Sequence, residues 1–208
     1  MTGAFIAFVG LPGAGKSTVC EALAARMRGV ALMEPEDWPP AVTDPSSAGG
    51  FTALTWFRAM RVPLYYRAVR ERDQGRVAVL DTYYDKICRH LLGAEGMDWF
   101  LSPRDPYFDL YQEIAERDWE LLPTADVIVS FQLSEDVWRH FLNKRSRIFD
   151  SEWGVSQAFH AQRHFVAAAE TLGGAFGVPV LPFVQEISSP DAAAARLLSA
   201  LRDAHVID

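Results

Sequence analysis

The chain has 208 residues, of which half are hydrophobic and 23% are charged, and its formal net charge is −7. This length suits a single domain, spanning 1–208, with a sizeable core. The acidic balance argues against a nucleic acid polymer as partner, because such a partner usually requires a basic face, and it favours a small molecule. No apolar run approaches the length of a membrane helix, so we expect no membrane association.

The two cysteines, Cys20 and Cys88, do not indicate a disulfide scaffold. A reducing cytoplasm is therefore the expected location. The apolar segment at the N-terminus runs directly into a glycine-rich loop, and we interpret it as a core strand and not as a signal peptide.

Short apolar runs alternate with helical patterns along the chain. The expected strands span 4–10, 29–34, 76–81, 125–133 and 178–184. The expected helices span about 16–28, 51–73, 83–94, 106–121 and 155–172, with one more after Ser134 as N-cap and a last one from Pro190. The stretch "PPAVTDPSSAGG", 39–50, is expected to be a mobile loop. This alternation predicts a three-layer α/β fold, in which helices cover both faces of a five-stranded parallel sheet.

The segment "GLPGAGKS", 10–17, matches the phosphate-loop pattern G-x-x-x-x-G-K-[ST] at each fixed position. Its glycines let backbone N–H groups turn toward phosphate oxygens, and the following helix points its positive end at the same place. In this motif Lys16 reaches the β and γ phosphates, and the Ser17 hydroxyl joins Mg²⁺. The residues expected to hold ATP are Gly10, Leu11, Pro12, Gly13, Ala14, Gly15, Lys16, Ser17 and Thr18.

Two acids follow predicted strands at the edge of the sheet where ligands bind in open parallel sheets. Glu34 follows the second strand and is the candidate general base, with Glu36 as its competitor; alternatively Glu34 is a solvated acid. Asp81 ends the third strand and is the candidate metal-side carboxylate, with helix capping as the alternative. We expect Asp85, further along, to lie on an exposed helix face.

The segment "NKRSRIFDSE", 143–152, is a basic turn suited to closing over a transferred phosphate. Arg145 and Arg147 are the candidate lid residues, because arginine suits bidentate phosphate contact, and a solvated basic turn is the alternative. A guanine-reading N-K-x-D is absent, since Ser146 stands in the aspartate position, and Tyr84 replaces the glycine that a GTPase switch places after the third strand. These observations favour a small phosphotransferase.

The order of these motifs resembles the deoxyribonucleoside kinase and thymidylate kinase superfamily over most of the chain. The segment "EPEDW", 34–38, is similar to the E-P-…-W segment of deoxynucleoside kinases but is one residue shorter. The resemblance implies strand order 2-3-1-4-5, Glu34 as the base on a sugar 5′-hydroxyl, and lid arginines that clamp phosphates. It also implies that "QEISSPD", 185–191, lies near the adenine, and that the protein forms a homodimer.

The part of the sequence expected to bind the acceptor departs from this family. The family's arginine after the third strand is missing in "DTYY", 81–84, and the helix after the loop lacks the family's base-pairing glutamine. That helix instead offers aromatic and cationic side chains. The candidate substrate-binding residues are Glu34, Trp38, Trp56, Phe57, Arg58, Arg61 and Tyr84. Packing in the core is the alternative for the aromatic residues, and surface exposure is the alternative for the arginines.

The sequence therefore predicts an ATP- and Mg²⁺-dependent kinase for a hydroxyl of a nucleoside or nucleoside-like compound. The alternatives are a nucleoside monophosphate kinase that uses Arg58 and Arg61, a kinase of another metabolite or antibiotic, and an ATP-binding regulatory switch. His160 and His164 have a spacing that can bind metal, but we interpret them as surface residues.

Overall fold

The computed structural model describes residues 3–35, 37–39, 42, 45–145 and 155–207. Within these residues, the five strands are β1 (Ala4–Val9), β2 (Val30–Leu32), β3 (Val77–Leu80), β4 (Val127–Gln132) and β5 (Val180–Val184). They form one sheet in the order β2-β3-β1-β4-β5, and all pairings are parallel. The predicted fold class and the strand order implied by the resemblance are both confirmed.

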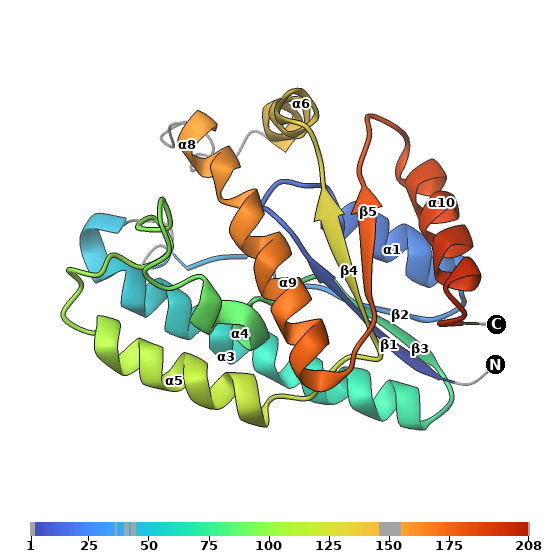
Figure 1. The fold of residues 1–208 in the computed structure, drawn as a ribbon, viewed down its shortest axis with the longest axis horizontal. Coiled ribbons are helices and arrows are strands. Elements are labelled where there is room, and N and C mark those ends of the chain that lie inside the picture. The colour runs from blue at the N-terminus through green and yellow to red at the C-terminus, as the bar shows by residue number, and fades with distance from the viewer. Residues whose placement is uncertain (1–2, 36, 40–41, 43–44, 146–154, 208) are drawn as a thin grey trace.

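The helices connect the strands and return the chain to the same edge of the sheet each time (Figure 1). They are α1 (Lys16–Arg26), α3 (Pro45–Asp73), α4 (Tyr84–Ile87), the 3₁₀ helix η1 (Cys88–His90), α5 (Phe108–Leu121), α6 (Glu135–Arg145), α8 (Val155–His160), α9 (Gln162–Phe176) and α10 (Pro190–Asp203). Ser134 caps α6 as predicted, because its Oγ accepts a hydrogen bond from the N–H of Val137 at 3.4 Å.

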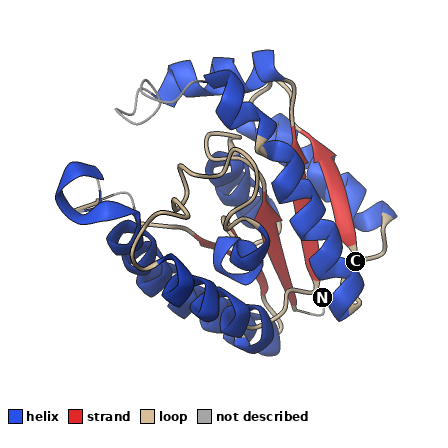
Figure 2. Ribbon diagram, turned by 60° about the vertical axis from the view of Figure 1, so that its left-hand side comes forward, coloured by secondary structure: helices blue, strands red, loops and turns tan. Residues whose placement is uncertain are grey.

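Two apolar cores lie on opposite faces of the sheet, so the molecule has three layers (Figure 2). The alternation of strand side chains explains this division. In β1, Phe5 and Ala7 face α3 and α9, whereas Ile6 and Phe8 face α1 and α10. Each β1 side chain from 4 to 9 is buried, as expected for the central strand of a parallel sheet.

Three expected elements, two helices and one loop, differ in the structure. The helix expected over 83–94 is divided into α4 and η1, and residues 84–88 are all buried, so the segment is not an amphipathic surface helix. The helix expected over 155–172 is divided between α8 and α9. Gln162 fixes the start of α9, because its side chain accepts from the N–H of Leu133 and donates to the Leu133 carbonyl.

The segment 39–50 was expected to be a loop throughout, but α3 already begins at Pro45. Proline is well tolerated in the first turn of a helix, where its missing N–H has no intrahelical partner. The helix is interrupted at Gly49, whose φ of 70° and ψ of 167° are not helical. Across the described residues, no helix combines the length and apolarity needed to cross a membrane.

Candidate active site

The phosphate loop joins the end of β1 to the start of α1, as the sequence predicted. Gly13 and Gly15 have φ values of 78° and 76°, in the left-handed region that favours glycine. A β-carbon on Gly13 would lie 2.6 Å from Cδ2 of Leu142, so the loop also passes close to α6. Both the backbone conformation and the close packing therefore require glycine at position 13.

Lys16 is buried and its side chain is folded into the loop. Its Nζ donates to the carbonyl oxygens of Gly10 at 3.1 Å and Leu11 at 2.8 Å. It also lies 2.9 Å from the hydroxyl of Tyr84, which itself donates to the Gly10 carbonyl at 2.7 Å. The ammonium group thus lies among backbone oxygens at the place where the motif predicts phosphate binding.

Ser17 and Asp81 meet where α1 approaches the end of β3. The hydroxyl of Ser17 donates to Oδ2 of Asp81 at 2.9 Å, and Asp81 is buried. A hydroxyl beside a carboxylate is a donor set that suits Mg²⁺, which prefers oxygen ligands. The side chain of Thr18 turns away, because its Oγ1 donates to the Gly15 carbonyl at 3.0 Å and is exposed.

Glu34 and Arg61 form the second group at this edge of the sheet. Nη1 of Arg61 donates to Oε1 of Glu34 at 2.9 Å, and the Glu34 side chain is 21% exposed. The other two nitrogens of Arg61, Nε and Nη2, bind the two oxygens of Asp85 at 2.8 and 3.0 Å. Burial disfavours the charge of Arg61, but Asp85 and Glu34 outweigh it and raise its pKa well above the ordinary value.

Asp85 does not lie on an exposed helix face, so that expectation was wrong. Its side chain is 1% exposed and faces Arg61 from α4. A carboxylate is rarely buried unless it is paired, and the bidentate contact with a guanidinium satisfies this requirement. The four-residue helix α4 is too short to show a hydrophobic period, which explains why the sequence pattern did not indicate this burial.

Arg58 also forms a bidentate ion pair, but with a different helix. Its Nε and Nη2 donate to the two oxygens of Asp118 on α5 at 2.6 and 2.7 Å. The hydrogen bonds that Arg58 donates to Asp118 raise the pKa of Arg58. The two arginines expected to contact a substrate are therefore both bound to carboxylates of the protein.

The predicted aromatic residues fall into two groups. Trp38, Trp56 and Phe57 pack together, with ring centroids of Trp38–Phe57 and Trp56–Phe57 both 5.1 Å apart, and the Phe57 ring lies 5.4 Å from the Arg61 guanidinium. Nε1 of Trp38 donates to the Pro35 carbonyl at 2.8 Å. Tyr84 is separate from this cluster and lies against the phosphate loop.

Helix α6, which leads to the predicted lid, contacts the phosphate loop directly. Nε1 of Trp138 donates to the Pro12 carbonyl at 2.9 Å, and Leu142 packs beside Gly13. Arg145 lies in α6, but its side chain lies outside the described residues, as do Arg147 and Glu36. The roles predicted for these three residues stay predictions.

Nothing in the sequence pattern indicated that Trp138, Leu142 or Asp118 lies near the site. A tryptophan and a leucine four positions apart on a helix ordinarily indicate core packing, which is also part of what they do here. Only the folded chain shows that they pack against a loop more than a hundred residues earlier in the sequence.

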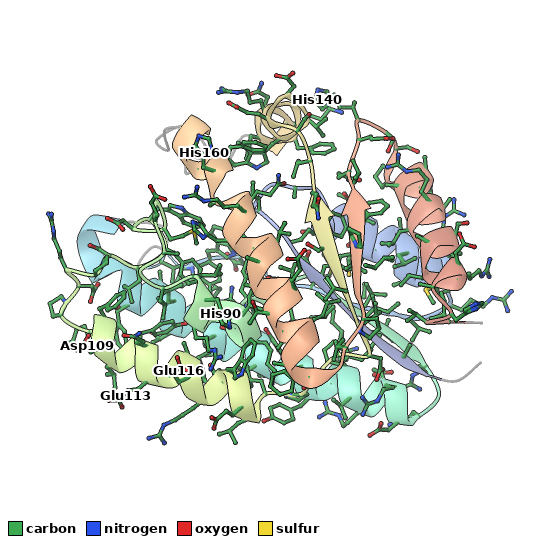
Figure 3. The ribbon with its side chains drawn as sticks, viewed as in Figure 1. His90, Asp109, Glu113, Glu116, His140 and His160 are labelled. Carbon is green, nitrogen blue, oxygen red and sulfur yellow. The ribbon has the colours of Figure 1, made fainter. Side chains whose placement is uncertain are left out.

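Other titratable residues lie away from this site. Asp109, Glu113 and Glu116 follow one face of α5, at the opposite end of the molecule from α6, and His160 lies on α8 (Figure 3). His160 is exposed, whereas Nε2 of His164 lies 2.9 Å from the Glu95 carbonyl. Burial raises the pKa of both cysteine thiols, so neither is a reactive thiolate at neutral pH.

A scan against protein-family models finds no match, and a search of the curated proteins likewise finds none. Solved structures do match. A deoxyadenosine kinase from M. mycoides with bound dATP gives a TM-score of 0.72 at 16% identity, covering 95% of this chain and 99% of that chain. The same enzyme with products dCMP and dCDP gives 0.64 at 14% identity, covering 96% and 99%.

A thymidylate kinase from Candida albicans gives a TM-score of 0.60 at 17% identity, covering 99% of this chain and 93% of that chain. Likeness at this level of identity establishes the fold, which is the α/β phosphate-loop fold that these kinases share. The resemblance noted in the sequence therefore extends to the architecture of nearly the whole chain.

Proposed function

We propose that this protein is an ATP- and Mg²⁺-dependent kinase that transfers the γ-phosphoryl group to a hydroxyl of a small molecule of the nucleoside type. The phosphate loop fits a triphosphate, because Lys16 and the N-terminus of α1 meet there. Bound ATP-Mg²⁺ would supply the phosphoryl group and the metal charge. Lys16 and Ser17 would hold the phosphates and the metal, and Asp81 would bind the metal side.

The arrangement of Glu34 is the observation that supports a hydroxyl acceptor. Arg61 binds Oε1, whereas Oε2 has no hydrogen-bond partner among the described residues, and the side chain is partly exposed. An oriented carboxylate with one open oxygen is suited to accept the proton of an acceptor hydroxyl. In this role Arg61 positions the base and does not itself bind the substrate.

The contacts of Arg58 and Arg61 argue against a nucleoside monophosphate as acceptor. Such an acceptor already carries a phosphate and needs cations to hold it, and these two arginines were the candidates. Each is bound in a bidentate pair to a buried carboxylate, Asp118 or Asp85. Releasing either arginine to a phosphate would leave that carboxylate buried and unpaired, which is costly.

The structural neighbours support both nucleoside and nucleotide chemistry, since one is a deoxyadenosine kinase and another a thymidylate kinase. This chain lacks the arginine that the resembled family has after β3, and it lacks the glutamine that reads the base. These two differences leave room for an acceptor other than an ordinary nucleoside. An ATP-binding regulatory switch is the alternative from a different functional class, one that is not an enzyme acting on a small molecule. A cytoplasmic location and a homodimer stay predictions.

The test is ADP release from ATP-Mg²⁺ in the presence of nucleosides, deoxynucleosides, their monophosphates, and hydroxylated metabolites and antibiotics. We expect stimulation by a compound with a free hydroxyl, with a product heavier by one phosphoryl group, and none for the Lys16→Ala variant. Stimulation by monophosphates alone would support the thymidylate-type alternative. Slow turnover that no acceptor stimulates would support the switch.

A further inference from the structure

Tyr84 links the phosphate loop to the acceptor side of the site. It is the first residue of α4 and is buried, with 8% of its surface exposed. Its hydroxyl lies 2.9 Å from Nζ of Lys16 and donates to the Gly10 carbonyl at 2.7 Å. The sequence suggested that Tyr84 forms a wall of the acceptor pocket. These contacts instead place its hydroxyl against the phosphate loop, where the phosphate donor would bind.

The ring of Tyr84 is fixed from two sides. Its centroid lies 5.4 Å from the ring of Phe165, and the guanidinium of Arg61 lies 5.6 Å from the Tyr84 ring. Arg61 in turn holds Glu34, the proposed base. Tyr84 therefore lies between the lysine expected to bind the terminal phosphates and the arginine that positions the acceptor's base.

In phosphoryl transfer the attacking and leaving oxygens lie roughly in line through the γ-phosphorus, so the γ-phosphoryl group lies between the donor's other phosphates and the acceptor. We propose that the Tyr84 hydroxyl binds the γ-phosphoryl group of the donor and thereby lets the site favour a nucleoside triphosphate over a diphosphate. This inference rests on the donor half of the proposed function and does not depend on which acceptor is used.

The chemistry of the phenol supports this role. Its single proton is directed to the Gly10 carbonyl in this structure, and rotation about the C–O bond can direct it to another acceptor. A phosphate oxygen is the stronger acceptor, because hydrogen bonds to ionised groups are stronger than those to neutral carbonyls. A diphosphate lacks the γ-phosphoryl group and would leave the proton on Gly10.

The experiment measures the dissociation constants of ATP-Mg²⁺ and ADP-Mg²⁺ by titration calorimetry, without any acceptor, for the wild-type protein and Tyr84→Phe. The phenylalanine keeps the ring and its packing but removes the hydroxyl. We expect ATP to bind about tenfold more weakly to the variant, the effect of losing one hydrogen bond to a charged group. ADP should change by less than about twofold, so the preference for ATP falls.

Tyr83→Phe is the matched control. Tyr83 is adjacent and buried, but its hydroxyl donates to the Pro123 carbonyl at 2.7 Å and accepts from the N–H of Ala125 at 2.9 Å. Its loss should lower the free energy of unfolding and leave the ratio of the two dissociation constants unchanged. This result would separate general destabilisation from recognition of the γ-phosphoryl group.

Equal weakening of ATP and ADP in Tyr84→Phe would overturn the inference and assign the hydroxyl to loop structure alone. An unchanged or increased preference for ATP would also overturn it. Failure of the donor half of the proposed function is distinguishable, because then the wild-type protein itself would bind neither nucleotide.

Discussion

Nη1 of Arg61 lies 2.9 Å from Oε1 of Glu34, while the rest of the same guanidinium binds both oxygens of Asp85. One buried cation thus holds two carboxylates from different parts of the chain, one following β2 and one on α4. The contact engages one oxygen of Glu34, whose side chain is partly exposed, and the other oxygen is the one proposed to act as the base.

Arg61→Met should lower the free energy of unfolding by about 3 to 5 kcal/mol, because it leaves the buried carboxylate of Asp85 without its cation. Urea denaturation measures this value. Arg67→Met is the matched control, since Arg67 lies on the same helix but is exposed and forms a 3.8 Å pair with Glu71. That variant should change stability by less than about 0.5 kcal/mol. Similar losses in both variants would contradict the role assigned to the Arg61 group.

Glu34→Gln should reduce phosphoryl transfer to a hydroxyl acceptor by a factor of about 10² to 10⁴, the usual contribution of a general base. Glutamine retains an oxygen for Arg61, so the midpoint of thermal unfolding should stay close to that of the wild type. Initial rates with the best acceptor measure the effect. Asp37→Asn, at an exposed neighbouring acid, should retain the wild-type rate. Full activity in Glu34→Gln would remove Glu34 as the base.

Asp81→Asn should raise the Mg²⁺ concentration needed for half-maximal ATP turnover by about tenfold, because it removes the negative charge beside Ser17. A Mg²⁺ titration at fixed ATP gives this midpoint. Asp98→Asn changes an exposed acid in a turn far along the chain and serves as the control. If the two variants have the same Mg²⁺ midpoint, Asp81 does not act on the metal.

Lys86 predicts a pH dependence of stability. Burial lowers its pKa from the ordinary 10.5 to about 8, while its Nζ donates to the Leu122 carbonyl at 2.6 Å. Because the folded pKa lies below the unfolded one, the unfolded chain binds more protons between pH 8 and 10.5, and stability attributable to Lys86 rises with pH across this window. The slope is at most about 1.4 kcal/mol per pH unit.

Chemical denaturation at several pH values, for wild type and Lys86→Met, measures this contribution. The difference in unfolding free energy, wild type minus variant, should increase from pH 8 to pH 10. A difference that stays flat or falls over this range would show that the pKa of Lys86 is not lowered in the folded protein.

Much of the fold could be predicted from the sequence, for reasons visible in particular residues. The run from Ala4 to Val9 is apolar at each position, which indicates a strand buried on both faces. The glycines and Lys16 that follow match the phosphate-loop motif, which has few other functions. The strand order came from the resemblance and not from periodicity, because sequence spacing does not state which strands are neighbours.

The contacts within the site could not be predicted in the same way. Glu34 and Arg61 were both candidates, but they lie 27 residues apart in the sequence. Their pairing depends on how α3 packs against the sheet. Asp85 was expected to be exposed, because its partner Arg61 is distant in sequence and α4 has only four residues. Tyr84 was assigned to the acceptor side, since its aromatic ring gave no indication that its hydroxyl reaches Gly10.

The most direct test of the central claim is phosphorus NMR of the product formed from ATP and the acceptor that most stimulates ADP release. If the protein phosphorylates a hydroxyl with Glu34 as base, the product should be a phosphate monoester, in which the phosphoryl group is on an oxygen bonded to carbon. The Glu34→Gln variant should form almost none of this product. A phosphoanhydride, in which the phosphoryl group is joined to an existing phosphate, would contradict the account. Inorganic phosphate as the sole product would contradict it as well.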